Sequence, residues 1–456
     1  MATSTSAKRR RSLDRWTDSL GRHLPGLSRP EAKGLALWSI GIVLARSCSL
    51  HAVVLALSCW HAFNPLSLRR RLQEWYCEAA AKKGHGSGAW GVQRRDWDPE
   101  ALSADLLAWI LEDWPDRQLV LALDPTNLGD RFTVLNLSVL YRGCAVPVIW
   151  TVVEGGEPGA WEPHWERMLG ILAGRVPAGW EVLVLTDRGM YSPRLFGCLM
   201  ELHWHPFLRI RAQGFYRPAD GQEWLDLKDL CPQIGETRAS RAEVFKNEEG
   251  RLECTLVAFS GEGYAEPWLI LTDLAPEVAK ARWYGLRGWI EQGYKRIKGE
   301  GWKLPRTRIR DCRRLERLWL AVAVATMWVL MVGGEAEVDG ATAEGKADTS
   351  RSEEEAPCAA DLGPSECSGK ESAGTKAAAP PRIWSVFGRG WNVLRNALAV
   401  GLLMLGSWHP EPWPDHPHQG LPPTPAACAE ATEGRPHTAH QPTGARARMI
   451  HDNDSS

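Results

Sequence analysis

The chain has no C-x-x-C pair, and its 11 cysteines are an odd number scattered over 456 residues. This pattern argues against a disulfide framework and against a structural zinc site, and it indicates a reducing cytoplasm. We expect no signal peptide, because no long apolar core or small-residue cleavage site closely follows the basic N-terminus. Long apolar runs are also missing: Leu318 to Gly334 is uncharged for only 17 residues, short of the roughly 20 that cross a bilayer. We expect no membrane span, and fractionation would exclude one built on this segment.

Charge of one sign is concentrated locally, although the net charge is only −1. Residues 281–317 carry twelve Lys or Arg against four Asp or Glu, and residues 1–100 carry sixteen against eight. Residues 335–371 reverse this, with eleven acids against three bases. Two basic regions predict a polyanionic partner, whereas the acidic stretch is typical of a solvated linker.

Three carboxylates stand out in what the sequence does contain. Asp124 and Asp187 each end a short apolar run that predicts a buried strand, whereas Glu291 lies in a helical pattern. Ligands of open α/β sheets gather where strands end. Either aspartate alone is more often a turn or capping residue. Together with Glu291 they predict an oxygen-only site, which suits Mg²⁺ or Mn²⁺.

The helical segment around Glu291 repeats polar residues at regular spacing. Tyr284, Arg287, Glu291 and Lys298 lie at offsets 0, 3, 7 and 14, so we expect them on one helix face. Arg287 and Glu291 also have the spacing of an ordinary ion pair within a helix. That pairing is compatible with a site, because basic residues beside a metal-binding carboxylate can hold a phosphate.

This spacing resembles the third motif of DDE transposases in the bacterial insertion-sequence group with the Y-R-E-K signature, similar to insertion sequence family four. The D-R-G motif of that group stands here as Asp187-Arg188-Gly189, and its first motif as Asp124-Pro125-Thr126. The resemblance extends from about residue 27 to residue 334. The third motif is specific, whereas the first two alone would be weak signals.

The resemblance implies an enzyme that cleaves DNA at element ends and joins them to target DNA by a two-metal mechanism. Asp124, Asp187 and Glu291 would bind two Mg²⁺ or Mn²⁺ ions, with Asp124 bridging both. Tyr284, Arg287, Lys298 and Trp268 would bind DNA; Trp268 stacks on a flipped base in the family, although packing in a β region is an equal alternative. Terminal inverted repeats, target DNA and a second copy of the chain are the implied partners, in a bacterial, nucleoid-associated location.

The implied fold is α/β, with an RNase H-like core of mixed sheet and helices. We expect a basic disordered N-terminus (1–26), a helical domain with possible DNA-end binding (27–115), the first part of the core (116–214), a β-rich insertion (215–272) and the catalytic helix part (273–334). An acidic disordered linker (335–380), a C-terminal helix (381–409) and a disordered tail (410–456) would follow.

Other readings of the sequence stay open at this point. The enzyme could be an RNase H-like nuclease without strand transfer, or a silent DNA-binding remnant. Gly86, Gly88 and Gly91 form G-x-G-x-x-G, but no strand precedes them, so we expect a loop. His203 and His205 lie near Cys198 without a fourth ligand, which favours packing over zinc binding. Asp130 and Arg131 follow Asp124 closely and are expected to form a loop ion pair.

Overall fold

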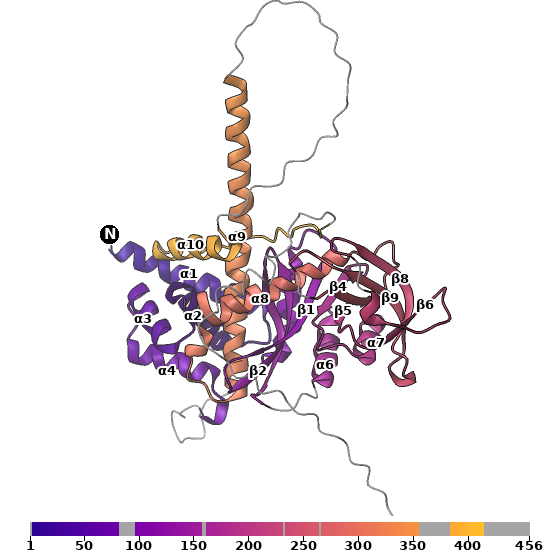
Figure 1. Ribbon diagram of the computed structural model, residues 1–456. Coiled ribbons are helices and arrows are strands. Elements are labelled where there is room, and N and C mark those ends of the chain that lie inside the picture. Colours follow the sequence, from indigo (N-terminus) through magenta and orange to yellow (C-terminus); the bar gives the residue numbers. More distant parts are fainter. Residues whose placement is uncertain are drawn as a thin grey trace, which may run out of the picture.

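The computed structural model describes residues 2–81, 96–156, 161–230, 233–263, 266–354 and 384–414. A group of helices lies beside one large sheet, and a long helix runs between the two (Figure 1). The helices are α1 Ala2–His23, α2 Arg29–Ala45, α3 Leu50–Trp60, α4 Pro65–Tyr76, α5 Ser103–Glu112, α6 Glu162–Ala173, α7 Pro193–Glu201, α8 Gly288–Lys295, α9 Cys312–Glu354 and α10 Val386–Ala399.

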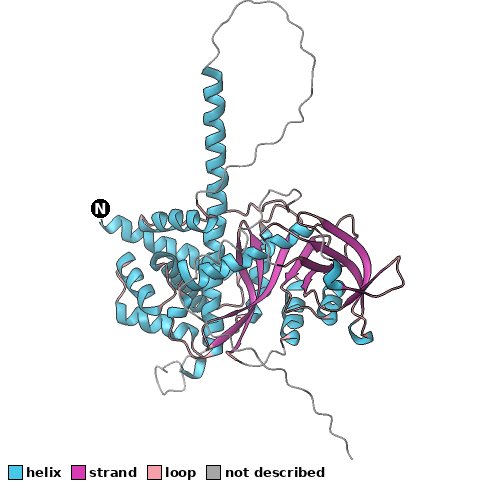
Figure 2. Cartoon of the chain, viewed as in Figure 1, coloured by secondary structure: helices cyan, strands magenta, loops and turns pink. Residues whose placement is uncertain are grey.

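A single mixed sheet of ten strands forms the other half of the molecule (Figure 2). Its order is β3-β2-β1-β4-β5-β10-β9-β8-β6-β7. The strands are β1 Gln118–Asn127, β2 Phe132–Tyr141, β3 Cys144–Glu154, β4 Glu181–Thr186, β5 His205–Ile210, β6 Phe215–Pro218, β7 Leu225–Asp226, β8 Thr237–Val244, β9 Leu252–Phe259 and β10 Trp268–Thr272. Three hairpin-linked strands, β1 to β3, are followed by alternating helices and strands, so the predicted α/β fold with an RNase H-like core is confirmed.

The predicted insertion at 215–272 contains the expected strands, but they do not form a separate sheet. β10 pairs antiparallel with β5 on one side and with β9 on the other, so β9, β8, β6 and β7 extend the core sheet. Backbone hydrogen bonding drives this, because strand β5 would otherwise leave an open edge.

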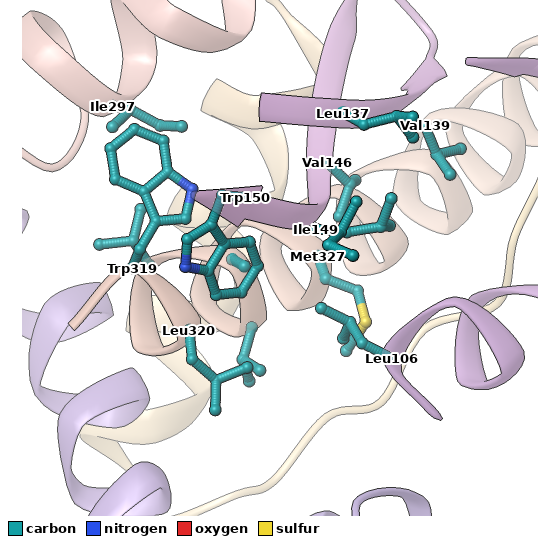
Figure 3. Packing of buried hydrophobic residues seen from close by; sticks show 14 of the residues in the cluster. Leu106, Leu137, Val139, Val146, Ile149, Trp150, Ile297, Trp319, Leu320 and Met327 are labelled. Atoms are coloured by element: carbon teal, nitrogen blue, oxygen red, sulfur yellow. The ribbon is translucent and has the colours of Figure 1, made fainter. Parts of the chain in front are cut away.

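Alternate residues of the strands face two different cores. On one face, Leu121 and Val184 pack with α5, α6 and α9. In Figure 3 the side chains of Trp150 and Trp319 lie close together in this core, and Ile297 reaches it from the segment that follows α8. On the opposite face, the segment from Ala279 to Tyr294 packs on a second core. The central strands β1, β4, β5 and β10 are therefore covered on both faces, as their apolar runs predict.

The N-terminal residues differ from the expectation of a disordered segment at 1–26. They form α1, because Leu13, Trp16 and Leu20 recur at helical spacing and are fully or almost fully buried. The Trp16 ring stacks on Trp328 of α9 at 4.5 Å between centroids. A capping box begins α2, with the Glu31 carboxylate accepting from the Ser28 backbone N–H.

The prediction that an acidic linker starts at residue 335 is wrong, because residue 335 lies within helix α9. The helix continues to Glu354, because its alanine and glutamate residues are strong helix formers. The part from Cys312 to Gly340 is long and apolar enough to cross a membrane, but 94% of its most apolar window is buried inside the protein. Helices α2 and α3 meet the same test only as a pair bent by 91°. In the described residues, α9 is thus the central core helix.

The C-terminal part is also more ordered than expected near residue 410. Trp413 packs on Trp283 at 5.0 Å between ring centroids, and Trp408 packs on Tyr141 at 4.8 Å. These large rings bury apolar area that holds residues 400–414 against the body. The glycines at 86, 88 and 91, most of the predicted linker after residue 354, and the tail beyond residue 414 lie outside the described residues.

Candidate active site

The twofold alternation of β-strands brings both aspartates to one face of the sheet. Val120 and Ala122 of β1 belong to the core beneath α8, so Asp124 faces the same side. Leu185 of β4 also faces α8, and Asp187 follows it two residues later, just beyond the end of the strand. The apolar residues before each aspartate therefore determine where its carboxylate points.

The register of the two strands then brings the aspartates side by side. β1 and β4 are parallel neighbours, with Leu123 opposite Thr186. The next step along both strands pairs Asp124 with Asp187. Glu291 reaches them from α8, which lies across this face of the sheet (Figure 1). Asp124, Asp187 and Glu291 together are called the acid cluster below.

One guanidinium joins all three carboxylates of the acid cluster. Arg287 Nη2 donates to Asp124 Oδ1 at 2.9 Å and lies 3.4 Å from Asp187 Oδ2. Its Nη1 donates to Glu291 Oε1 at 2.8 Å. The Arg287 side chain is only 12% exposed, whereas the Glu291 side chain is 54% exposed. Arg287 is therefore the positive centre of the cluster, and its strongest partner is the buried Asp124.

Burial changes the acid–base properties of the cluster. It raises the pKa of Asp124 to about 6, and the negative charges of Asp187 and Glu291 add to this, whereas Arg287 opposes it. Burial by itself would lower the pKa of Arg287. Tyr284 and the three carboxylates together raise this pKa by more than burial lowers it, so Arg287 stays charged. At neutral pH the cluster holds more negative than positive charge.

Two further residues connect this segment to strand β1. The Lys298 ammonium donates to Thr126 Oγ1 at 2.9 Å, two residues beyond Asp124 on the same strand face. Burial lowers the pKa of Lys298, although nearby Asp124 opposes the shift. The Tyr294 hydroxyl donates to the Asp124 backbone carbonyl at 2.7 Å. These contacts hold the α8 segment in register with the strand that carries Asp124.

The segment from Tyr284 to Lys298 is not one regular α-helix. A 3₁₀ turn (Ala281–Arg287) precedes α8, and a π-helical turn (Arg296–Glu300) follows it. The expectation of four residues on one regular helix face is therefore wrong. Packing and glycine explain the change, because the positions of Gly288, Gly299 and Gly301 weaken a continuous helix.

Tyr284 and Trp268 are packed inside the protein. Tyr284 is 3% exposed, and its hydroxyl donates to the Thr186 carbonyl at 3.2 Å. Trp268 is 6% exposed and meets the Tyr284 ring edge-on at 5.1 Å. Their burial supports the packing alternative for Trp268 and places the Tyr284 ring under the site. Base stacking by Trp268 stays an untested prediction.

The sequence reasoning missed Arg209. Its Nη1 lies 4.0 Å from Asp187 Oδ1, and its guanidinium lies 6.0 Å from the centre of the Tyr284 ring. The signal was present: an arginine interrupts the apolar strand β5, and it shares the strand face of buried Phe207. His205, on the same strand, bonds Asp273 at 2.8 Å, and this hydrogen bond raises the pKa of His205.

The donor atoms of the acid cluster suit a hard divalent cation, but their present spacing does not hold one. In the described part of the chain, no group of three or more His, Cys, Asp or Glu residues stands ready to bind a metal ion. Arg287 occupies the space between the carboxylates. Arg287 Nε, Arg209 Nε and Thr186 Oγ1 are buried there without hydrogen-bond partners among the described residues. The oxygen-only set fits Mg²⁺ or Mn²⁺ once the guanidinium moves.

Residues 123–328 match the family model described as "Transposase DDE domain". This part of the chain is therefore similar to transposase DDE domains. The match begins one residue before Asp124 and ends within α9, so it contains all three carboxylates. The predicted enzyme class, a DNA transposase that cuts and joins DNA strands, is confirmed at the level of this domain.

One solved structure, described as "Cryo-EM structure of piggyBac transposase synaptic complex with hairpin DNA", is similar with a TM-score of 0.36 and 12% sequence identity. The similarity covers 66% of this chain and 66% of that one. No curated protein sequence matches the chain. The domain assignment therefore rests on the family model and on the geometry of the acid cluster.

Proposed function

We propose that the protein is a DNA transposase that cleaves DNA at the ends of a mobile element and joins the freed ends to target DNA. The observation that carries this is the acid cluster: two aspartates on neighbouring parallel strands and a glutamate from α8 surround one point inside a transposase DDE domain. The finer assignment, to the bacterial insertion-sequence group with the Y-R-E-K signature, is supported by the spacing of Tyr284, Arg287, Glu291 and Lys298.

The three carboxylates would hold two Mg²⁺ or Mn²⁺ ions. Bound ions of this kind activate a water or a 3′-hydroxyl and stabilise the leaving oxygen of a phosphodiester. Asp124 lies at the centre of the acid cluster, because the Arg287 guanidinium that binds it also contacts Asp187 and Glu291. Its rigid place on β1 keeps this geometry, since Tyr294 bonds the Asp124 carbonyl.

Arg287 and Lys298 are the proposed phosphate-binding residues. Arg287 can offer two parallel donors to a phosphate, whereas Lys298 acts as a single charge. When metal and DNA enter, a scissile phosphate offers Arg287 a new anionic partner in place of the carboxylates. Tyr284 and Trp268 would support the site from below, because both rings are packed between the sheet and the segment that carries Arg287.

The proposed partners are terminal inverted repeats, target DNA and a second copy of the chain in a synaptic complex. A nuclease without strand transfer is the main alternative, since hydrolysis and strand transfer use the same carboxylates. Joining of paired ends to a plasmid target separates the two. Release of ends without any joined product would favour the nuclease, and neither product would favour a silent remnant.

Removing one metal ligand at a time tests the proposal. Asp124→Asn, Asp187→Asn and Glu291→Gln should each lower Mg²⁺-dependent cleavage of element ends by more than the roughly 10–100-fold cost of losing an outer partner of a ligand. DNA binding should persist. Asp130→Asn, an exposed acid in the β1–β2 turn, is the matched control and should retain activity. Full activity in any of the three ligand variants would contradict the assignment.

A further inference from the structure

A second feature lies outside the acid cluster, where the chain runs from α8 towards α9. Here the surface is hollowed by a groove of about 810 Å³. This groove, called the arginine groove below, is lined by Arg69, Arg306, Arg308, Arg310 and Arg314. Asp311 is the only acid that lines it among the described residues. Sites for small molecules are mostly apolar, so this polar basic lining indicates another kind of ligand.

The segment 306–310 exposes three arginines beside one buried isoleucine. Arg306, Arg308 and Arg310 are exposed, whereas Ile309 between them is buried. Arg306 ends the 3₁₀ turn Leu304–Arg306, and Arg308 and Arg310 follow it in a connecting segment without regular secondary structure. Among the described residues, none of these three side chains makes an ion pair or a hydrogen bond to protein. Arg314 and Arg317 nearby are different, because both contact Glu78.

Arg131 anchors this segment to the catalytic sheet. From the turn between β1 and β2, its guanidinium donates to the Ile309 carbonyl at 2.7 Å and to the Thr307 carbonyl at 3.4 Å. These contacts replace the loop ion pair expected for Asp130 and Arg131. An arginine that binds backbone carbonyls leaves the neighbouring arginine side chains free to face solvent.

The arginine groove also continues the line of the active site. Along the β1–β2 hairpin, Asp124 comes first, then Thr126 with Lys298 bonded to it, and then Arg131 at the turn beside residues 305–309. The opposite wall comes from Ser49 and His51 at the start of α3 and from Arg69 and Gln73 of α4. In Figure 1 the start of α9, just after this segment, lies beside α4.

We propose that the arginine groove binds the phosphodiester backbone of the DNA that extends away from the acid cluster. This deepens the proposed function and rests on it for the identity of the ligand. Unpaired arginines on a fixed backbone suit phosphates, which need donors but no base-specific contact. The groove would hold the flanking DNA in line while Arg287 and Lys298 hold the scissile region.

The test measures affinity for duplex DNA of arbitrary sequence against salt concentration, in chelator without divalent metal. The combined variant Arg306→Gln, Arg308→Gln and Arg310→Gln should flatten the logarithmic salt dependence by about one unit per lost contact and weaken binding roughly tenfold or more. The control combines Arg29→Gln, Arg117→Gln and Arg175→Gln, three exposed arginines outside the groove with the same change in charge. It should change the slope far less.

Three outcomes would overturn the proposal. An unchanged slope in the groove variant would show that these arginines do not touch DNA. An equal loss in the control would show a general charge effect, and tighter binding of single-stranded RNA than of DNA would assign another nucleic acid. Thermal melts of both variants should match the parent, since exposed arginines contribute little to stability. Because the test needs no cleavage, loss of the proposed activity in the ligand variants would be seen separately.

Discussion

The acid cluster and the arginine groove use arginines from one basic stretch of sequence in opposite ways. Arg287 is buried and joins three carboxylates, whereas Arg308 is exposed and has no ion pair among the described residues. A buried charge must be paired or pay for its desolvation. An exposed one keeps its hydration and can meet an external anion. Arg287 therefore stabilises the folded protein and, in the proposed function, also binds a phosphate. The arginines of the groove are available only to a ligand.

The largest expected difference between the two regions is in stability. Without divalent metal, Arg287→Ala should lower the free energy of unfolding by about 2–3 kcal/mol, because Asp124 loses its buried partner. The Arg287–Glu291 ion pair contributes little to this loss of stability, since the Glu291 carboxylate is half exposed. Arg308→Ala is the matched change in the groove and should stay within about 0.5 kcal/mol of the parent.

Denaturant unfolding of both variants measures this difference. Added Mg²⁺ should restore part of the stability lost in the Arg287 variant, because a cation replaces the missing positive charge among the carboxylates. Equal stability of the two variants would break the comparison, since it would mean that Arg287 is no more needed by the folded protein than an exposed arginine.

A smaller effect concerns pH, and it should appear only in the acid cluster. The pKa of Asp124 is raised to about 6 from its ordinary 3.8. Its ionised form therefore costs stability above pH 6, and this cost is relieved as the pH falls from 6 towards 3.8. Metal affinity should change in the opposite sense, falling by up to about tenfold per pH unit below 6, because a proton competes for the carboxylate.

Titration of Mn²⁺ binding by electron paramagnetic resonance at several pH values checks this. Asp124→Asn should remove the pH dependence near 6 together with most of the affinity. Binding of DNA by the arginine groove without metal should show no such step, since arginines keep their charge throughout this range. A midpoint of metal binding near the ordinary pKa of an aspartate would contradict the role of burial.

The smallest effect on DNA binding and stability is expected for Lys298, which lies between the acid cluster and the arginine groove. Lys298→Ala should reduce the salt dependence of DNA binding by about one unit and lower stability by about 1 kcal/mol through the lost bond to Thr126. Lys295→Ala, one turn earlier and exposed, should leave stability almost unchanged. If both variants behave alike in binding and in melting, Lys298 holds no special place between the regions.

Much of the fold and of the candidate site could be predicted from local patterns in the sequence. The strands Phe132–Tyr141 and Trp268–Thr272 lie where the sequence has apolar and β-branched runs between turn residues. The two aspartates at strand ends and the spacing of Arg287, Glu291 and Lys298 pointed to one site. Helix α1 was missed because its charged N-terminal residues masked the apolar face formed by Leu13, Trp16 and Leu20.

By itself, the sequence determined which residues have the chemistry: three carboxylates, the basic stretch after Glu291, and the alternation that turns each aspartate to one face of its strand. Only the tertiary structure decided that Arg287 lies among all three carboxylates, that β10 joins β5 and β9 in one sheet, and that Arg131 fixes the segment 305–309. Strand register and contacts between distant segments are set by packing of the whole chain, and spacing along the sequence does not encode them locally.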